Sequence, residues 1–410
     1  MSSRMAHVAC GLFAALATDT VFAAWEVVPD VTFAVGVDDN PRLNDPELLD
    51  TGTARSAWVD ARVGLTNTTE RSSVFFEPRL RSDSYADSKD ADLESDDVFL
   101  TARAERRSAR GGRIGLQSFI SRESILSSEL LDAAPLDPDA PDPPPVDTGV
   151  LARPDEYRSR VLLSPDVEAS LSERSSLLLD ARYQDVSYSG PPTGGRSDFE
   201  DMAFGIGIAR NVNDRNRATA RLIVSSFEAD LTSNETDTVG VEGTFTRTLS
   251  SLWTFALTTG LQRSEIDFVR NGLPDSDVDT SVTLGVGFRK RTEVARLNLD
   301  LQRLVTPNAS GFLEQRDQFR FSLSRRLRER LTADFAVRLI DSKALGDVQA
   351  FDREYARLSL GVLWALRPQW SLDVGFDTIK QDFSNAERDG TSNSVRVGMT
   401  YRGLSRNRTF

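Results

Sequence analysis

The stretch "ALRPQWSLDVGFDTI", residues 365–379, contains the end of one expected strand, a tight turn and the beginning of another strand. After the turn, Trp370, Leu372, Val374 and Phe376 alternate with polar or small residues, so their side chains share one face of a strand. Similar stretches recur about every forty residues, which indicates a repeated structural unit. The sequence therefore predicts a series of hairpins.

The same alternation continues in "LWTFALTTGL" (252–261), "SVTLGVGFR" (281–289), "VARLNLDLQ" (294–302) and "LTADFAVRL" (331–339). Each run has one apolar face and one polar or small face. A strand of about ten residues, rising about 3.3 Å per residue and tilted by about 45°, spans about 24 Å. That is the height of the apolar band of an outer-membrane barrel. A soluble sandwich or a propeller is the alternative, but the signature of propeller blades is absent.

Short and long connections are expected to alternate along the chain. The short ones lie near 67–72, 107–112, 172–176, 211–216, 248–251, 290–293, 327–330 and 366–369. The long ones lie near 38–56, 84–96, 121–155, 189–198, 229–236, 266–278, 305–316, 341–352 and 382–393. This pattern predicts an all-β fold, a transmembrane antiparallel up-and-down β-barrel with short periplasmic turns and long extracellular loops.

The expected strand count is about eighteen, with sixteen as the alternative, and both termini are expected on the short-turn side. Pro29, Pro78 and Pro165 fall in or beside strand-like runs. Because proline cannot donate a hydrogen bond to a neighbouring strand, these three positions leave the count open.

The first residues predict a secretory signal peptide. Arg4 supplies a positive charge, residues 8–17 are mainly apolar, and residues 21–23 resemble a cleavage site. We therefore expect residues 1–23 to be a signal peptide and residues 24–410 to be the outer-membrane barrel.

Composition excludes several functions. The only cysteine is Cys10 and the only histidine is His7, so the predicted mature chain has neither. This argues against thiol chemistry, a Cys- or His-ligated zinc and a histidine general base, so we expect no enzyme activity, cofactor or metal. The net charge of −13 repels nucleic acid. No later segment has the apolar run of about eighteen residues that a membrane-spanning helix needs.

Arginine is frequent on the expected inner face of the strands. The candidates for lumen-facing residues are Arg62, Arg79, Arg103, Arg182, Arg221, Arg296, Arg320, Arg338, Arg357 and Arg396. Many have a carboxylate two residues away, such as Asp60 and Arg62 or Asp180 and Arg182. Two interpretations stay open: the arginines bind a polar or acidic solute such as a sugar polymer, or neighbouring strands pair these charges and stiffen the wall.

Three other features bear on the barrel. The tryptophans near short turns or the start of the mature chain are candidates for membrane-interface aromatics: Trp25, Trp253, Trp364 and Trp370. Inward-phase glycines such as Gly205 and Gly207 are expected to leave the wall bare, which would widen the lumen or admit a plug. The Pro- and Asp-rich segment 127–156 is either a constriction folded into the mouth or a solvated surface loop.

The chain resembles the family of outer-membrane β-barrel porins associated with exopolysaccharide and exosortase gene clusters. The resemblance rests on "WEVVPDVTFAVGVDDNPRL" (25–43), "SRESILSSELLDAAP" (121–135), "RSRVLLSPDVEASLSERSSLLLDARYQDVSYS" (158–189) and "NSVRVGMTYRG" (393–403). It implies a barrel that helps an extracellular polysaccharide to cross the bacterial outer membrane or to assemble there. The tail 404–410 departs from the usual pattern, and either Tyr401 or Phe410 could be the terminal aromatic residue.

The expected function is therefore an outer-membrane channel that assists the export or assembly of an extracellular polysaccharide. The alternatives are a general diffusion porin for small polar solutes, and a plugged barrel with a structural or surface-interaction role. The expected partners are outer-membrane lipid, a polysaccharide and periplasmic export components, and no nucleic acid is expected.

Overall fold

The computed structural model describes residues 25–41, 43, 52–87, 93–109, 111–125, 156–189, 196–230, 234–270, 273–345, 352–383 and 388–408. The predicted signal peptide, the segment 127–155 and Phe410 lie outside the described residues. No helix among the described residues is long and apolar enough to cross a membrane.

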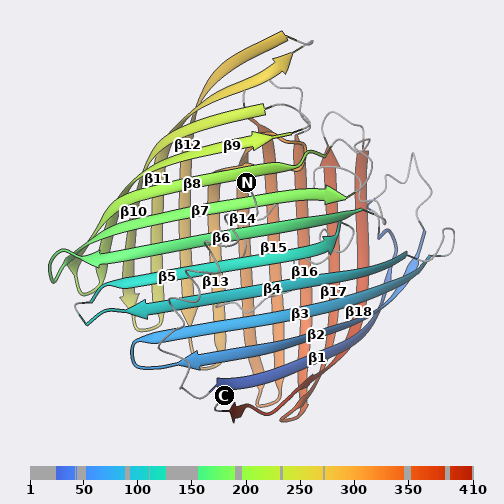
Figure 1. The fold of residues 1–410 in the computed structure, drawn as a ribbon. Coiled ribbons are helices and arrows are strands. Elements are labelled where there is room, and N and C mark those ends of the chain that lie inside the picture. The colour runs from blue at the N-terminus through green and yellow to red at the C-terminus, as the bar shows by residue number, and fades with distance from the viewer. Residues whose placement is uncertain are drawn as a thin grey trace.

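The described residues form one antiparallel sheet (Figure 1). Its strands in the first half are β1 Trp25–Asp38, β2 Ala54–Thr68, β3 Ser72–Asp87, β4 Leu93–Arg107, β5 Arg113–Ser124, β6 Tyr157–Ser170, β7 Ser175–Ser189, β8 Phe199–Asn213 and β9 Asn216–Ala229. Those in the second half are β10 Asn234–Ser250, β11 Trp253–Arg270, β12 Leu273–Arg291, β13 Ala295–Pro307, β14 Leu313–Arg328, β15 Leu331–Ala344, β16 Arg353–Arg367, β17 Trp370–Phe383 and β18 Arg388–Arg402.

Each strand pairs with the next along the chain, and the sheet closes on itself where β1 pairs with β18. The closing register runs from Asp30 opposite Arg402 to Asp38 opposite Ser394. The prediction of a closed antiparallel barrel is confirmed, and the count is eighteen strands. A short extra strand, β19 Arg406–Arg408, pairs with Trp25–Val27 of β1, so the tail beyond Tyr401 extends the closing seam.

The three prolines lie inside strands, at places where the pairing is interrupted. Between β2 and β3 the paired positions stop at Arg79 and resume at Phe76, on either side of Pro78. Between β6 and β7 they stop at Leu163 and resume at Asp166, on either side of Pro165. Since a proline cannot donate to the neighbouring strand, the barrel includes each proline at the cost of a local gap in the ladder.

Several predicted long loops are partly strand. Most of the expected loop 266–278 belongs to the β11–β12 hairpin, with Arg270 opposite Leu273, and half of the expected loop 229–236 belongs to β9 and β10. The outward apolar alternation of β11 ends after Leu261. Glu265 and Asp267 lie on the outer face and Ile266 and Phe268 on the inner face, although the backbone pairing continues. The β11–β12 hairpin, gold in Figure 1, therefore projects beyond its neighbours.

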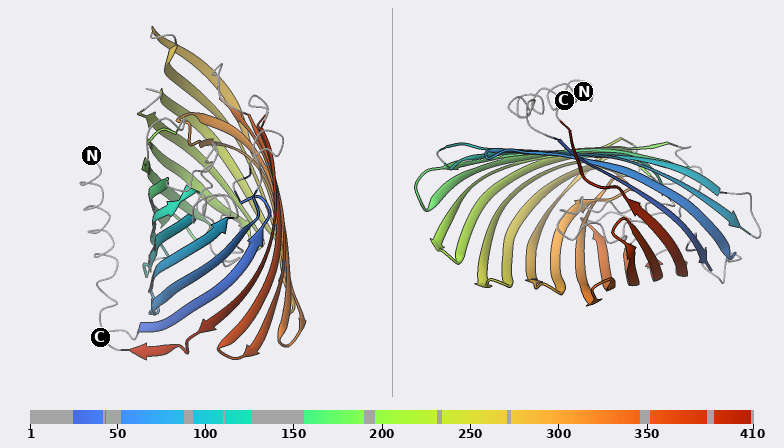
Figure 2. Two further views of the ribbon diagram at one scale, coloured as in Figure 1. Left: turned by 90° about the vertical axis from the view of Figure 1, so that its right-hand side faces the viewer. Right: turned by 90° about the horizontal axis from the view of Figure 1, so that it is seen from below.

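Seen from below, the barrel is flattened rather than circular (Figure 2, right). The blue to green strands of the first half form a nearly flat side, and the yellow to red strands of the second half form a bowed side. We call the end with the long connections the mouth and the other end the short-turn end.

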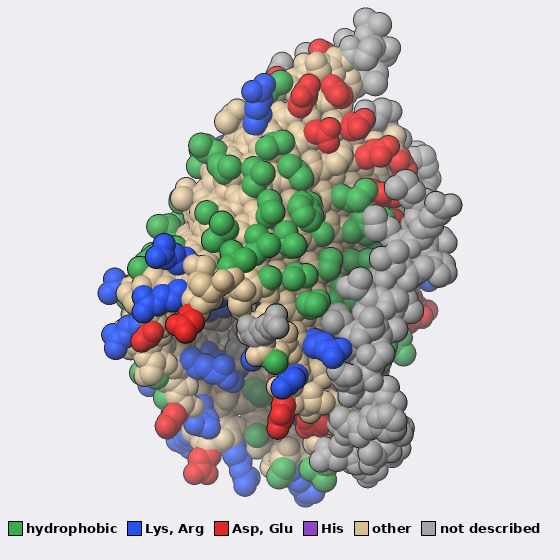
Figure 3. All heavy atoms as spheres, turned by 60° about the vertical axis from the view of Figure 1, so that its left-hand side comes forward, with side chains coloured by type: hydrophobic (Ala, Val, Ile, Leu, Met, Phe, Trp, Pro, Cys, Tyr) green, Lys and Arg blue, Asp and Glu red, His purple; other side chains and the backbone are tan. Residues whose placement is uncertain are grey.

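The outer face of the barrel carries a belt of exposed aliphatic and aromatic side chains. Val35 and Leu80 are each 59% exposed, Val239 and Val241 are 55% exposed, and Leu261 is 54% exposed. Figure 3 shows such side chains gathered in a band, with acidic side chains above it and basic ones among the charges below it. So much exposed apolar surface is unfavourable in water, whereas a lipid bilayer accommodates it. The structure agrees with the predicted location in the bacterial outer membrane.

Candidate functional site: the inner wall of the barrel

Alternate residues of each strand point inward or outward, and we call these two sets the inner phase and the outer phase. The pairing register shows which set of each strand continues the inner face of its neighbour. Residues opposite each other in a sheet point to the same side. All ten predicted arginines lie on the face opposite the exposed aliphatic belt: Arg62, Arg79, Arg103, Arg182, Arg221, Arg296, Arg320, Arg338, Arg357 and Arg396. Their part in transport stays a prediction.

Several of these arginines contact carboxylates of neighbouring strands. Arg79 on β3 bonds Asp60 on β2 through its Nε atom, at 2.8 and 3.0 Å from the two carboxylate oxygens. Arg357 lies 2.9 Å from Asp377 on the next strand. Such ion pairs link neighbouring strands and stiffen the wall. At these positions the structure therefore agrees with the second interpretation, in which neighbouring strands pair their charges.

The partner of an arginine is often different from the carboxylate two residues away in sequence. Arg62 contacts Asp30 on β1 at 3.4 Å, and Arg182 contacts Asp201 on β8 at 2.7 Å. Pairs within one strand do occur, between Arg81 and Asp83 for example. Spacing along the sequence therefore identifies the charged residues of the wall, whereas the register decides which of them meet.

Three arginines lie directly opposite one another across three adjacent strands. Arg320 on β14 is opposite Arg338 on β15, and Arg338 is opposite Arg357 on β16. Asp300 on β13 is opposite Arg320, and Asp377 bonds Arg357. This arginine row, Arg320, Arg338 and Arg357, therefore places three cations side by side on one part of the wall, with a carboxylate beside each end of the row.

Aromatic rings are a second component of the inner wall, and the sequence interpretation did not include them. The guanidinium of Arg79 lies 5.0 Å from the ring centre of Phe99, and that of Arg103 lies 5.7 Å from the ring centre of Phe75. The rings of Phe99 and Phe119 are 6.4 Å apart. The inward position of Phe75 was visible in the sequence, since Phe75, Glu77 and Arg79 are spaced by two residues and therefore share one face of the strand. Guanidinium groups close to aromatic rings give this part of the wall both charged and flat apolar surfaces.

Inward glycines have a more specific role than the predicted bare wall. A Cβ atom at Gly205 would lie 2.7 Å from an oxygen of Asp180, and one at Gly207 would lie 2.6 Å from Cγ of Arg221. Asp180 is on β7 and Arg221 is on β9, yet their side chains form an ion pair across the inner face of β8. The two glycines of β8 therefore leave room for a charge pair that crosses the strand between its partners.

One connection at the mouth folds against the inner wall. The β13–β14 connection, residues 308–312, lies close to the start of β8 and of β10. The backbone N–H of Ser197 donates to the carbonyl of Ala309 at 2.8 Å, and the side-chain amide of Asn234 donates to the carbonyl of Gly311 at 3.0 Å. Ala309 is fully buried. This inward connection lies at the mouth and narrows it.

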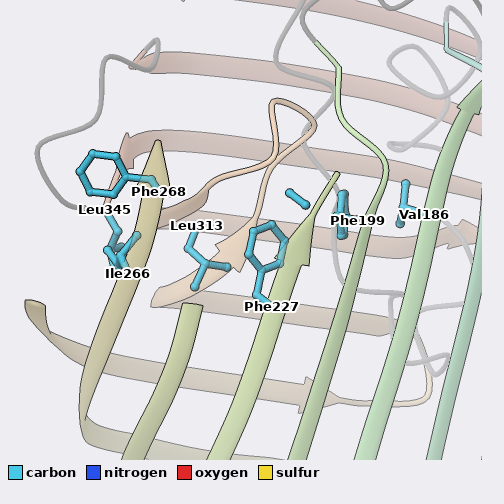
Figure 4. Packing of buried hydrophobic residues seen from close by; sticks show 8 residues of the cluster. Val186, Phe199, Phe227, Ile266, Phe268, Leu313 and Leu345 are labelled. Carbon is cyan, nitrogen blue, oxygen red and sulfur yellow. The ribbon is translucent and has the colours of Figure 1, made fainter. Parts of the chain in front are cut away.

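An apolar cluster supports the inward connection. Leu313, directly after it, packs with Phe199, Phe227, Ile266 and other buried side chains of β7–β11 (Figure 4). The rings of Phe199 and Phe227 are 5.6 Å apart. Because Phe199, Phe227 and Ile266 belong to the inner phase of their strands, the wall near the mouth is apolar here and charged further down.

A second segment at the mouth packs on the opposite half of the barrel. Leu43 follows β1 and contacts Tyr355 of β16 and Ile379 of β17, both of which are inner-face residues. The side-chain amide of Asn40 donates to the carbonyl of Thr391 at 3.0 Å. Segment 127–156, expected to be either a constriction or a surface loop, lies outside the described residues except for Glu156. The narrowing that the described residues show comes from two other connections.

The four predicted interface aromatics lie near the short-turn end, on the outer phase of their strands. The ring of Trp370 is 5.0 Å from that of Tyr401, Trp364 is 50% exposed, and Nζ of Lys290 lies 4.7 Å from the ring of Trp253. Trp25 packs against a cluster that includes Val74. Their contact with lipid stays a prediction. The fifth tryptophan, Trp58, belongs to the inner phase, where the guanidinium of Arg81 lies over its ring.

The part of the chain that the structure describes contains no group of three His, Cys, Asp or Glu side chains that could hold a metal ion. The chemistry available along the described inner wall is that of arginines, carboxylates, hydroxyls and aromatic rings. This set can bind and guide a polar solute through hydrogen bonds and charge.

Comparison with solved structures finds distant likenesses that extend over nearly the whole chain. OccAB2 from Acinetobacter baumannii is 10% identical, with a TM-score of 0.44, covering 92% of this chain and 98% of its own. The outer membrane protein opdK from Pseudomonas aeruginosa is 12% identical, with a TM-score of 0.43, covering 93% and 99%. The FrpB iron transporter from Neisseria meningitidis is 8% identical, with a TM-score of 0.44, covering 94% and 82%. No family model and no curated protein matches the chain.

Proposed function

We propose that the protein is an outer-membrane channel for polar solutes and that its cargo is an acidic polysaccharide or its fragments. The observation that carries the proposal is the inner wall, which combines the arginine row of β14–β16 with arginines that lie over aromatic rings of β3–β5. Guanidinium groups bind carboxylates with two parallel hydrogen bonds, and flat rings offer apolar faces to sugar rings. A barrel of eighteen strands is wide enough for an aqueous lumen.

The family resemblance of the sequence supports a polysaccharide as the cargo. General diffusion of small polar solutes is an equally good fit to the barrel alone, because a charged wall also suits simple ions and small metabolites. A plugged barrel is favoured by one observation, the packing of residues 308–313 and Leu43 at the mouth. These functions differ in conductance and in charge selectivity.

The arginine row should set the charge selectivity of the channel. We expect Arg320→Gln, Arg338→Gln and Arg357→Gln, combined, to lower the preference for anions several-fold, because three positive charges leave one part of the wall. The measurement is the reversal potential in a planar bilayer under a salt gradient.

The matched control is Arg303→Gln, which removes an arginine from the outer face of β13. It should leave the reversal potential unchanged. An unaltered reversal potential in the triple variant, with the barrel still folded, would reject a role for the row in selectivity.

A further inference from the structure

The edge of the apolar belt at the short-turn end carries regularly spaced cations. Arg210 on β8, Arg247 on β10, Lys290 on β12 and Arg325 on β14 occupy outer-phase positions close to the short turns. Arg210, Arg247 and Arg325 are exposed, and Lys290 is half-buried. Because they lie on every second strand, they are about 10 Å apart around the barrel. We call these four residues the basic edge.

The neighbours of the basic edge are aromatic and aliphatic. Lys290 lies opposite Trp253 with its Nζ atom 4.7 Å from the ring, and Arg247 lies opposite Phe255, whose ring is 4.9 Å from that of Phe288. Tryptophan at the end of an apolar belt marks the depth at which lipid headgroups begin. Long basic side chains at that depth keep their stems along the apolar surface and their charges at the headgroups.

The opposite edge of the belt, on the same strands, has the opposite sign. Outer-phase positions near the mouth on β8–β14 include these acidic residues: Glu200, Glu228, Glu235, Asp237, Glu265, Asp267 and Asp317. Arg263 and Arg303 are present there too, and Asp317 bonds Arg303. Figure 3 shows acidic side chains gathered above the belt, and basic side chains together with some acidic ones below it. These outer-phase positions of β8–β14 therefore carry a net positive charge at the short-turn end and a net negative charge near the mouth.

We propose that the basic edge binds the phosphate groups of anionic glycerophospholipids in the leaflet at the short-turn end. The chemistry is a charge-assisted hydrogen bond from guanidinium or ammonium to phosphate, beside rings that pack on the upper part of the acyl chains. The spacing gives each cation its own phosphate. Binding there would hold the barrel at a fixed depth and favour insertion with the short turns toward that leaflet. This proposal is independent of what the lumen transports.

The test uses the whole barrel, residues 24–410, in mixed micelles containing phosphatidylglycerol and phosphatidylcholine. Native mass spectrometry then counts the lipids that the protein retains. We expect the wild type to retain phosphatidylglycerol preferentially. The variant Arg247→Gln, Lys290→Gln and Arg325→Gln should lose that preference several-fold.

Two further variants separate charge at this edge from charge in general. The combination Arg247→Lys, Lys290→Arg and Arg325→Lys keeps the charge and should keep the preference. The combination Arg263→Gln, Arg303→Gln and Lys343→Gln removes three outer-face cations near the mouth and should also keep it. A shift in gel mobility on heating establishes that each variant is folded.

The proposal is overturned if the glutamine variant of the basic edge retains phosphatidylglycerol like the wild type. It is also overturned if the variant near the mouth is the one that loses the preference. A third contrary result is displacement of phosphatidylglycerol from the wild type by lipid A, since the basic edge would then serve a different lipid.

Discussion

Gly205 and Gly207 show how single residues shape the inner wall. Their positions on β8 lie between Asp180 and Arg221, which meet across that strand. A methyl group at Gly205 would occupy space that the carboxylate of Asp180 fills at 2.7 Å. The charge pair therefore depends on a residue that takes part in no charge interaction of its own.

We predict that Gly205→Ala destabilises the barrel by about 1 kcal/mol, because the new methyl group displaces a side chain that is held in place. The effect should shrink when Asp180→Ala is present, since the obstructing carboxylate is then gone. The measurement is the free energy of unfolding in urea for the four proteins of this double-mutant cycle.

The matched control is Gly361→Ala on the inner face of β16, where the nearest atom to a new Cβ would be 3.6 Å away. It should have little effect. Equal costs of Gly205→Ala with and without Asp180 would contradict the crossing pair.

The side on which a residue lies could be predicted from the sequence, whereas its contacts could not. Alternation assigns Arg62 and Arg79 to one phase without any knowledge of the neighbouring strand. Their partners, Asp30 and Asp60, depend on the register between strands, which the sequence of one strand does not contain. The aromatic rings at Phe75 and Phe99 were missed because apolar residues were expected only on the lipid side.

At the scale of elements, the sequence predicts the part of each strand that crosses the apolar belt, but it does not predict where the strands end near the mouth. The β11–β12 hairpin continues into a region where Glu265 and Asp267 are outer-phase and Asp275 and Asp277 are inner-phase. Because Ile266 and Phe268 are inner-phase on β11, the apolar residues change face there, and the outward apolar pattern that identifies a strand stops although backbone hydrogen bonds continue. The inward course of residues 308–312 also has no local signature, since it depends on Ser197 and Asn234 from distant strands.

The inward β13–β14 connection can be tested by cross-linking. Ser197→Cys with Ala309→Cys should form a disulfide readily, because a backbone hydrogen bond of 2.8 Å joins these two residues. The only natural cysteine is Cys10, so residues 24–410 contain no other thiol that could form a disulfide. The measurement is the free-thiol content of the folded barrel after mild oxidation.

The control pairs Ser197→Cys with Ser324→Cys, which lies eleven residues below Leu313 on β14, roughly 36 Å along the strand. This pair should stay reduced. Equal oxidation of both pairs, or of neither, would show that the connection does not rest against β8.

At the scale of the whole molecule, three parts of the barrel have different chemical character. The outer belt matches a membrane, the inner wall carries charge and aromatic rings, and two connections narrow the mouth. The closed barrel followed from the repeat in the sequence, because a sheet with an apolar outer face and a polar inner face closes most simply as a barrel in lipid. The repeat left sixteen or eighteen strands open, and the structure has eighteen. The flattened cross-section seen in Figure 2 has no such signal in the sequence.

The central claim is that the inner wall surrounds a path for polar saccharides. The most direct test is the single-channel conductance of the refolded barrel, residues 24–410, in a planar bilayer with and without an acidic oligosaccharide. We predict a stable conductance that the acidic oligosaccharide reduces and that a neutral oligosaccharide of the same length reduces less. A barrel that carries no current, or a current that neither saccharide changes, would contradict the claim.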